Sequence, residues 1–168
     1  MSKVIVITGA GVGLGRTLAR RFAADGDQVV LLGRTASKVE AAASEIGERA
    51  MALGCDVGQP DSVRATFKTI KDRHGRIDVL INNAAIFEPY KLVDATDEQL
   101  LNAVNTNLLG PMLCVRSALP LMQSGALIIN VTSEGVDIRL PCLIPYQSTK
   151  AGVESNTSGN ARGCNYFK

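Results

Sequence analysis

Residues 3–16 read KVIVITGAGVGLGR, a short apolar run that closes on a cluster of glycines. A continuous apolar run of this length indicates a strand buried on both faces, as in a parallel sheet. The next stretch, residues 16–24, has apolar residues at helical spacing, and Gly26 is placed to end that helix. Strand, glycine loop and helix together predict a phosphate-binding turn, because glycines admit a phosphate close to the backbone and a helix N-terminus supplies free N–H groups.

The glycines of this loop have the spacing T-G-x-x-x-G-x-G over residues 8–15. The form G-x-G-x-x-G does not fit, because Leu14 and Arg16 stand where its third glycine would be. The alternative is a glycine-rich turn that binds nothing, and the position between a strand and a helix argues against it.

A second pattern lies at the other end of the chain. Tyr146 and Lys150 are four residues apart, and Ser133 precedes the tyrosine by thirteen. On a helix, residues at i and i+4 share a face, so a lysine ammonium would stabilise the phenolate beside it. Such a tyrosine can exchange a proton with an alcohol or carbonyl oxygen. The alternative is a chance pair on a solvated helix face.

Strand and helix patterns alternate along the chain. Apolar runs at residues 28–32, 50–54, 77–82 and 126–131 follow the first strand, with helical patterns at 37–48, 61–74 and 97–122 between them. This alternation predicts a doubly wound parallel sheet in a three-layer α/β/α arrangement. Chemistry then gathers at the carboxyl ends of the strands. Residues that follow strand ends directly are Gly9, Arg34, Asp56, Asn83 and Ser133.

Bulk properties exclude several other classes. The length of 168 residues predicts one domain, and 46% apolar with 20% charged residues is typical of a globular protein. A net charge of +2 does not favour nucleic acid or a membrane as partner. No C-x-x-C spacing occurs, so a reduced cytoplasmic chain is expected rather than a disulfide scaffold or metal site. The cysteines are Cys55, Cys114, Cys142 and Cys164.

Taken in order, these motifs resemble those of the short-chain dehydrogenase/reductase family in its single-domain form. The resemblance covers residues 3–154, and Ala85 stands where the family usually has glycine. The matching segments are the loop at 8–15, Asp56-Val57, residues 82–85 (NNAA), Asn107, Ser133 and the Tyr146/Lys150 pair.

The resemblance implies a catalytic set of Asn107, Ser133, Tyr146 and Lys150, with no metal. Ser133 would hydrogen-bond the substrate oxygen beside the Tyr146 hydroxyl. Lys150 would act on the phenol and also hold the nicotinamide ribose. Asn107 would hold a water that links the lysine to solvent; the alternative for this residue is a structural amide that braces a helix kink.

The resemblance also implies the residues that bind a dinucleotide cofactor. Asp56 would hydrogen-bond the adenine amino group, although an Asx residue after a strand is also a common turn former. Asn83 and Ala84 would line the cofactor through their backbone. The full expected set is Thr8, Gly9, Gly11, Val12, Gly13, Leu14, Arg34, Asp56, Val57, Asn83, Ala84, Tyr146 and Lys150.

The residue after the second strand discriminates between the two nicotinamide cofactors. Where an acidic residue would bind the ribose hydroxyls of NAD, this chain has Gly33-Arg34. A guanidinium suits a 2′-phosphate, so NADP(H) is favoured over NAD(H). The family often adds a second basic residue inside the glycine loop, and Val12 occupies that place. The alternative for Arg34 is an ordinary surface arginine.

The function that these features predict is an NAD(P)-dependent oxidoreductase that interconverts a carbonyl and an alcohol on a small molecule. The alternative is a fragment that binds dinucleotide and has little or no catalytic activity. A non-catalytic module on the same fold is disfavoured by the complete catalytic set. Family members are usually homo-oligomers.

The C-terminal segment departs from the resemblance. Residues 1–154 are expected to form a dinucleotide-binding domain that lacks the last strands of the family, and residues 155–168 a divergent tail without an apolar helical stripe. The strand at 126–131 would then be a sheet edge, prone to self-association. Tyr146 and Lys150 would be loosely held, so we expect cofactor binding to survive better than turnover.

Overall fold

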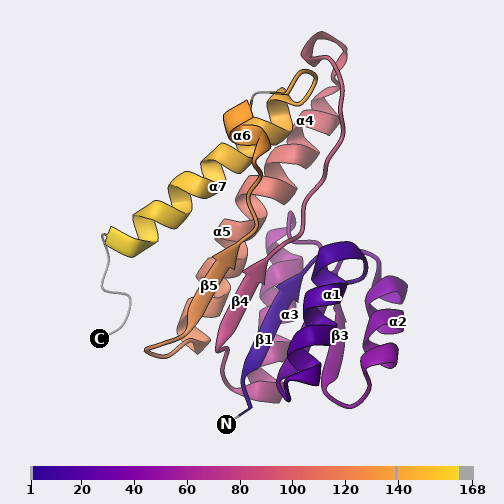
Figure 1. Cartoon of the computed structure of the whole chain (residues 1–168), viewed down its shortest axis with the longest axis vertical. Coiled ribbons are helices and arrows are strands. Elements are labelled where there is room, and N and C mark those ends of the chain that lie inside the picture. The colour runs from indigo at the N-terminus through magenta and orange to yellow at the C-terminus, as the bar shows by residue number, and fades with distance from the viewer. Residues whose placement is uncertain (1, 139, 163–168) are drawn as a thin grey trace.

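The computed structural model describes residues 2–138 and 140–162, and side chains as far as residue 156. Its strands form one parallel sheet in the order β3-β2-β1-β4-β5 (Figure 1). The strands are β1 Val4–Thr8, β2 Gln28–Gly33, β3 Ala50–Gly54, β4 Val79–Asn82 and β5 Leu127–Asn130. The helices are α1 Gly13–Ala24, α2 Ala36–Ile46, α3 Pro60–His74, α4 Asp97–Val104, α5 Gly110–Ala118, α6 Gly135–Ile138 and α7 Ile144–Arg162. Short helical turns are η1 Leu92–Asp94, η2 Asn105–Leu109 and η3 Leu119–Leu121.

The strand order reverses at β1, which confirms the doubly wound prediction. Val6 of β1 lies opposite Val30 of β2 on one side and opposite Leu80 of β4 on the other. The chain therefore builds the sheet outward from β1 in both directions. In doubly wound sheets a ligand binds in the crevice that this reversal leaves at the carboxyl ends of the strands.

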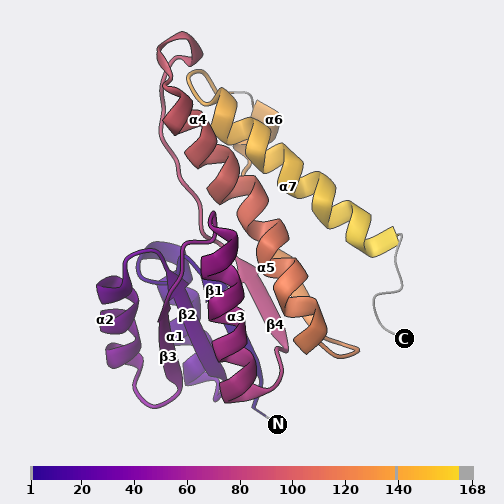
Figure 2. The ribbon, with the colours of Figure 1, turned by 180° about the vertical axis from the view of Figure 1, so that it is seen from behind.

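Both faces of the sheet are covered, which explains the unbroken apolar run of β1. Val4 and Val6 pack into one core with residues of α3 and α5, whereas Ile5 and Ile7 pack into a second core with residues of α1 and α2. Successive strand side chains point to opposite faces, so a strand between two helix layers needs an apolar residue at every position. Figures 1 and 2 show the two helix layers from opposite sides.

The predicted helix over residues 97–122 is interrupted. It consists of α4, the π-helical turn η2, α5 and the 3₁₀ turn η3. In η2 the Gly110 N–H bonds to the carbonyl of Asn105, five residues before it. Pro111 has no N–H to donate to the carbonyl of Asn107, which an uninterrupted α-helix would require. The interruption therefore follows from the position of the proline.

Helix α7 packs against α4 and η2, beside α5 (Figure 2). It continues to Arg162, although the polar residues after Val153 show no apolar stripe. Val153 is buried, and a helix anchored there adds a hydrogen bond for every further residue. The expected domain boundary at Glu154 thus falls inside α7, and the last six residues of the predicted tail lie outside the described residues.

Strand β5 lies at the edge of the described sheet, as expected, and pairs with β4. Leu127 and Ile129 leave 55% and 43% of their surface exposed, while Ile128 between them packs on the core. An apolar edge strand with unpaired backbone groups is a template for pairing with another chain.

We predict that Leu127→Lys reduces self-association of the chain. The side chain is already half exposed, and a lysine on an edge strand opposes strand pairing. Sedimentation velocity over a range of concentrations would measure the change, with thermal unfolding alongside. Ile128→Lys is the matched control, because it places the charge in the core and should lower the free energy of unfolding instead. Unchanged association of Leu127→Lys would show that the β5 edge is not the contact.

Candidate active site

The glycine loop joins the end of β1 to the start of α1. Gly9 and Gly13 have φ values of 65° and 56°, which side chains rarely adopt. A Cβ added at Gly15 would lie 2.6 Å from the Gly9 carbonyl oxygen, so this loop closes on itself only with glycine there. The first turn of α1 has no acidic residue, and the N-cap residue Val12 makes no side-chain capping bond. Its N–H groups are therefore suited to a pyrophosphate.

Thr8 and Asn83 hold this loop against the end of β4. The Thr8 hydroxyl accepts hydrogen bonds from the N–H groups of Asn83 and Ala84, at 2.9 and 3.0 Å. The Asn83 side-chain amide donates to the carbonyls of Thr8 and Gly9, at 2.9 and 3.2 Å. Thr8 is buried, so its hydroxyl serves the fold and positions the loop instead of facing a ligand.

A cavity of about 150 Å³ lies at the carboxyl ends of the strands, beside this loop. It gathers residues that follow β1, β2, β3 and β4, and so it joins four separate segments of the predicted cofactor set. Arg34 is exposed at this cavity and takes part in none of the ion pairs among the described residues. The lining residues are Gly9, Gly33, Arg34, Cys55, Asp56, Val57, Ala84, Ala85, Ile86 and Thr106.

Asp56 forms a turn as well as a wall of this cavity. One of its carboxylate oxygens, Oδ1, accepts a hydrogen bond from the Gly58 N–H at 3.0 Å. Its backbone N–H donates to the Ser62 hydroxyl at 3.0 Å. The first bond is that of an Asx turn, and the two bonds together fix the carboxylate at the cavity where the resemblance places the adenine.

The helix that carries Tyr146 is tied to the segment that carries Ser133. Lys150 Nζ donates to the carbonyl of Val131 at 2.6 Å, and Gln147 Nε2 donates to the carbonyl of Gly135 at 2.6 Å. The two acceptors lie two residues before and two residues after Ser133. Two bonds from α7 thus tie the helix that carries Tyr146 and Lys150 to the segment on both sides of Ser133.

The Ser133 hydroxyl is oriented by its own turn. Its oxygen accepts a hydrogen bond from the Gly135 N–H at 3.1 Å. A hydroxyl has one proton to donate, and this acceptance leaves that proton for another group.

Lys150 lies almost out of contact with water, with 4% of its surface exposed. Its Nζ is 5.8 Å from the centroid of the Tyr146 ring. Burial lowers the pKa of Lys150, because a desolvated ammonium is less stable than a hydrated one. The Val131 carbonyl offsets part of that cost by accepting one of its protons.

Asn107 lies buried in the π-helical turn, and its side chain bonds within the protein. Nδ2 donates to the Ile86 carbonyl at 2.9 Å and to the Thr149 hydroxyl at 3.3 Å. Oδ1 accepts from the Ile86 N–H at 2.7 Å. The amide therefore links the segment after β4 to α7. The Asn107 backbone carbonyl lacks its α-helical donor, because Pro111 has no N–H, so this carbonyl is an acceptor to which a water could bind.

Phe87 completes the surroundings of the tyrosine and was not predicted from the sequence. Its ring stands edge-on to Tyr146, with centroids 5.0 Å apart and planes at 87°, and 59% of its surface is exposed. Gln147 and Thr149 were also missed. None of these three residues carries a sequence signal, because their contacts join segments that only the fold brings together.

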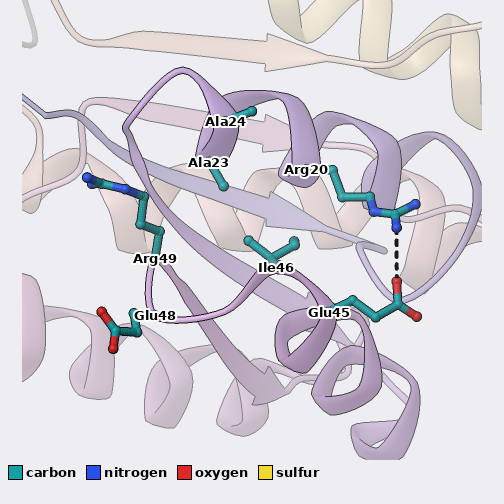
Figure 3. A pocket seen from close by; sticks show the side chains of 7 residues that line it. All are labelled: Arg20, Ala23, Ala24, Glu45, Ile46, Glu48 and Arg49. Atoms are coloured by element: carbon teal, nitrogen blue, oxygen red, sulfur yellow. Dashed lines mark ion pairs between the residues drawn. The ribbon is translucent and has the colours of Figure 1, made fainter.

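A more spacious hollow of about 530 Å³ lies away from these residues (Figure 3). It is formed between the C-terminal halves of α1 and α2 and the start of β3, at the amino ends of the strands. Arg20 and Glu45 across it form an ion pair at 3.4 Å. Ligands of doubly wound sheets bind at the carboxyl ends, so this hollow is not the candidate site.

Metal-ligating side chains and cysteines are the other reactive groups of interest in the described part of the chain. No group of three or more metal-ligating side chains occurs there, and none of its helices has the length and apolar character to cross a membrane. Cys55 and Cys114 are buried, and burial raises the pKa of both thiols. They are therefore poor nucleophiles. Cys142 is exposed, and Cys164 lies outside the described residues.

The lowered pKa of Lys150 predicts a pH dependence of stability. Between the pKa of the folded state and the ordinary value of 10.5, the unfolded chain binds more protons, so the free energy of unfolding rises with pH. Lys150→Met lacks this contribution. Denaturant titrations from neutral pH to about pH 10 should show the unmodified chain gaining stability relative to Lys150→Met.

Comparison with Lys150→Met isolates this contribution, because the two proteins differ at residue 150 alone. Lys71→Met is the control, because Lys71 is exposed and should give a pH profile parallel to that of the unmodified chain. Parallel profiles for Lys150→Met as well would show that the folded state does not destabilise the Lys150 ammonium.

Comparison with known proteins agrees with this geometry. Residues 3–166 match the family model described as short chain dehydrogenase, beyond the limit at Glu154 drawn from the sequence. A 3beta-hydroxysteroid dehydrogenase of Mediterraneibacter gnavus is 35% identical over 95% of the chain. A 3-oxoacyl-[acyl-carrier-protein] reductase of Bos taurus is 38% identical over 79% of it. The chain spans 59% and 57% of the lengths of these two curated relatives.

Solved structures give the same result. A 3-ketoacyl-(acyl-carrier-protein) reductase from Brucella melitensis, complexed with NADH, is 32% identical with a TM-score of 0.89. The match covers 95% of this chain and 69% of the reductase chain. A blue fluorescent protein from a metagenomic library, in complex with NADPH, is 30% identical with a TM-score of 0.89. The match covers 95% of this chain and 68% of the fluorescent protein's chain. The glycine loop, the Ser133 segment and the helix of Tyr146 and Lys150 lie at the carboxyl ends of the strands. Together with the match to the family model, they show that the chain belongs to the short-chain dehydrogenase/reductase family.

Proposed function

We propose that this chain is an NAD(P)-dependent oxidoreductase that interconverts a carbonyl and an alcohol, with Tyr146 as the acid/base. One observation carries the proposal. Two hydrogen bonds hold α7, which carries Tyr146, to the segment of Ser133. This contact lies at the carboxyl ends of the strands, as the glycine loop does. Proton transfer needs this kind of fixed positioning, and a chance pair on a solvated helix face would not bury its lysine.

The cofactor set fits the site that the glycines form. The loop at residues 9–14 and the uncapped start of α1 suit the pyrophosphate, and the cavity beside Arg34 and Asp56 suits the adenosine end. Gly11, Val12 and Leu14 would contribute through their backbone. When bound, a nicotinamide cofactor supplies or accepts the hydride.

The remaining work falls to the protein's own side chains. Tyr146 donates a proton to the carbonyl oxygen in reduction and removes it from the alcohol in oxidation. Ser133 donates its remaining proton to the same oxygen and stabilises the negative charge that develops there. The Lys150 ammonium lies beside the Tyr146 ring, 5.8 Å from its centroid, and would hold a ribose hydroxyl of the cofactor. Asn107 positions Lys150 through Thr149.

The exposed ring of Phe87 favours a substrate that has an apolar group beside its carbonyl. This ring stands against Tyr146, so a substrate oxygen that reaches the phenol brings its neighbouring atoms to an apolar wall. Such a wall also excludes water from the reacting oxygen. The names of the relatives, a hydroxysteroid dehydrogenase and oxoacyl reductases, agree with substrates of this kind.

Assembly and location stay predictions. We expect a homo-oligomer, since Leu101 and Val104 on α4 and Ile144 at the start of α7 are exposed apolar residues on neighbouring helices. A cytoplasmic location is expected from the cysteine usage of the sequence.

A second candidate is a dinucleotide-binding module with little or no turnover, and the exposed apolar face of β5 favours it. The two candidates differ in one experiment on the purified chain. Cofactor fluorescence measures binding of NADPH and NADH, and a panel of carbonyl and alcohol substrates measures turnover. Binding with turnover supports the oxidoreductase, whereas binding without turnover supports the second candidate.

We predict that Tyr146→Phe lowers kcat by roughly 10²–10⁴-fold, because it removes the proton donor and keeps the ring. Cofactor affinity should change little. Lys150→Met should damage both turnover and cofactor affinity, because Lys150 acts on the ribose as well as on the phenol. Tyr90→Phe is the matched control and should retain activity. Full activity of Tyr146→Phe in steady-state assays would refute the assigned role.

We also predict that NADPH binds more tightly than NADH, and that Arg34→Asp reverses this order. The change removes the partner of the 2′-phosphate and adds repulsion. Fluorescence titration of both cofactors tests the order, with Arg116→Asp on α5 as a control of equal charge change. Equal affinities of the unmodified chain for the two cofactors would contradict the assignment of Arg34.

A further inference from the structure

A second cation, Lys38, lies close to the cofactor loop. A Cβ added at Gly11 would lie 3.0 Å from the Lys38 Cβ and 3.3 Å from its carbonyl carbon. The first turn of α2 therefore lies directly against the glycine loop, with the stem of Lys38 beside Gly11. Any side chain at residue 11 would force these two segments apart.

The backbone of this turn is fixed by the residue that follows. Val39 is fully buried, and a Cβ added at Gly33 would lie 2.8 Å from its Cγ1. Glycines at both 11 and 33 thus allow the first turn of α2 to pack between the loop and the end of β2. The backbone and Cβ of Lys38 are therefore fixed, while its flexible four-carbon side chain is exposed.

No carboxylate neutralises Lys38 among the described residues. It takes part in none of their ion pairs, and the first turn of α2 has no acidic residue. The helical neighbours three and four residues further on are both alanines, residues 41 and 42. Arg16, which also follows the loop, differs because it pairs with Glu45 at 2.6 Å. Arg34 and Lys38 are therefore the two cationic side chains beside the glycine loop that no carboxylate of the described residues pairs with, so both are available to bind an anion there.

We propose that Lys38 acts with Arg34 as the second cation that binds the 2′-phosphate of an adenosine dinucleotide. This inference rests on the proposed function and deepens its cofactor preference. A phosphate monoester carries more charge than one guanidinium neutralises, and Arg34 and Lys38 stand on the two sides of the N-cap residue Thr35. Lys38 supplies from α2 the basic group that Val12 does not supply from the loop.

The test uses the adenosine half of the cofactor alone, so that it does not depend on turnover. Calorimetry would measure binding of 2′,5′-ADP and of 5′-ADP, which differ by the 2′-phosphate. Lys38→Gln should weaken binding of 2′,5′-ADP by about fivefold to tenfold and change binding of 5′-ADP less than twofold. Lys38→Arg should retain the preference for 2′,5′-ADP. Lys71→Gln on α3 is the matched control and should change neither affinity.

Each other outcome is informative. Equal weakening of both ligands by Lys38→Gln would overturn the inference, because Lys38 would then act on the pyrophosphate or on the loop itself. No weakening of 2′,5′-ADP would also overturn it, and the preference set by Arg34 would stand. Failure of the unmodified chain to bind either ligand, NADPH or NADH would instead refute the proposed function. Thermal unfolding of Lys38→Gln should match that of the unmodified chain, since the side chain is exposed.

Discussion

The Thr8 hydroxyl accepts hydrogen bonds from two consecutive backbone N–H groups, those of Asn83 and Ala84, and the site depends on this contact. β1 leads into the glycine loop, and β4 leads into the segment that reaches Phe87 and Ile86. The two strands pair side by side, but pairing alone does not fix the loops that follow them. The buried hydroxyl, with the Asn83 amide donating back to the Thr8 and Gly9 carbonyls, extends the order of the sheet into the loops. A buried network of this kind is rigid only when every member is satisfied.

A second constraint is the burial of the Lys150 ammonium. Removing a cation from water is costly, and the cost is tolerable only where fixed dipoles replace the lost water. Here the Val131 carbonyl does so, and the same bond joins α7 to the end of β5. Asn107 adds a bond to Thr149, the residue before the lysine, from a helical turn that a proline has widened. The bond that offsets the cost of burying the ammonium therefore also fixes the position of α7.

Glycines set how closely the backbone segments approach one another. Side chains at residues 9 and 15 would collide with the backbone of Ala84 and with the Gly9 carbonyl, so the loop is compact enough for a phosphate only as glycine. Gly11 and Gly33 act on the other side, where they admit the first turn of α2. Elements far apart in the sequence thus meet at the glycine loop, because the glycines contribute no side chain of their own to the contact. The exposed Leu127 and Ile129 of β5 are the opposite case, with apolar side chains and no described element over them.

The sequence by itself determined the parallel α/β fold, the loop at residues 8–15 and the placement of Tyr146 and Lys150 on one helix. These follow from local spacing, since the period of a strand or helix and the freedom of a glycine are properties of neighbouring residues. The break at η2 also has a local cause, the missing N–H of Pro111. The apolar period of residues 97–122 nevertheless predicts one continuous helix, because the period does not register a missing hydrogen bond. The tertiary structure decided the rest. Lys150 bonds a residue 19 positions away and Asn107 bonds one 42 positions away. Phe87 meets Tyr146, and Lys38 meets Gly11, only because the sheet brings their segments together. Such contacts depend on packing distances between elements, which no pattern of neighbouring residues encodes.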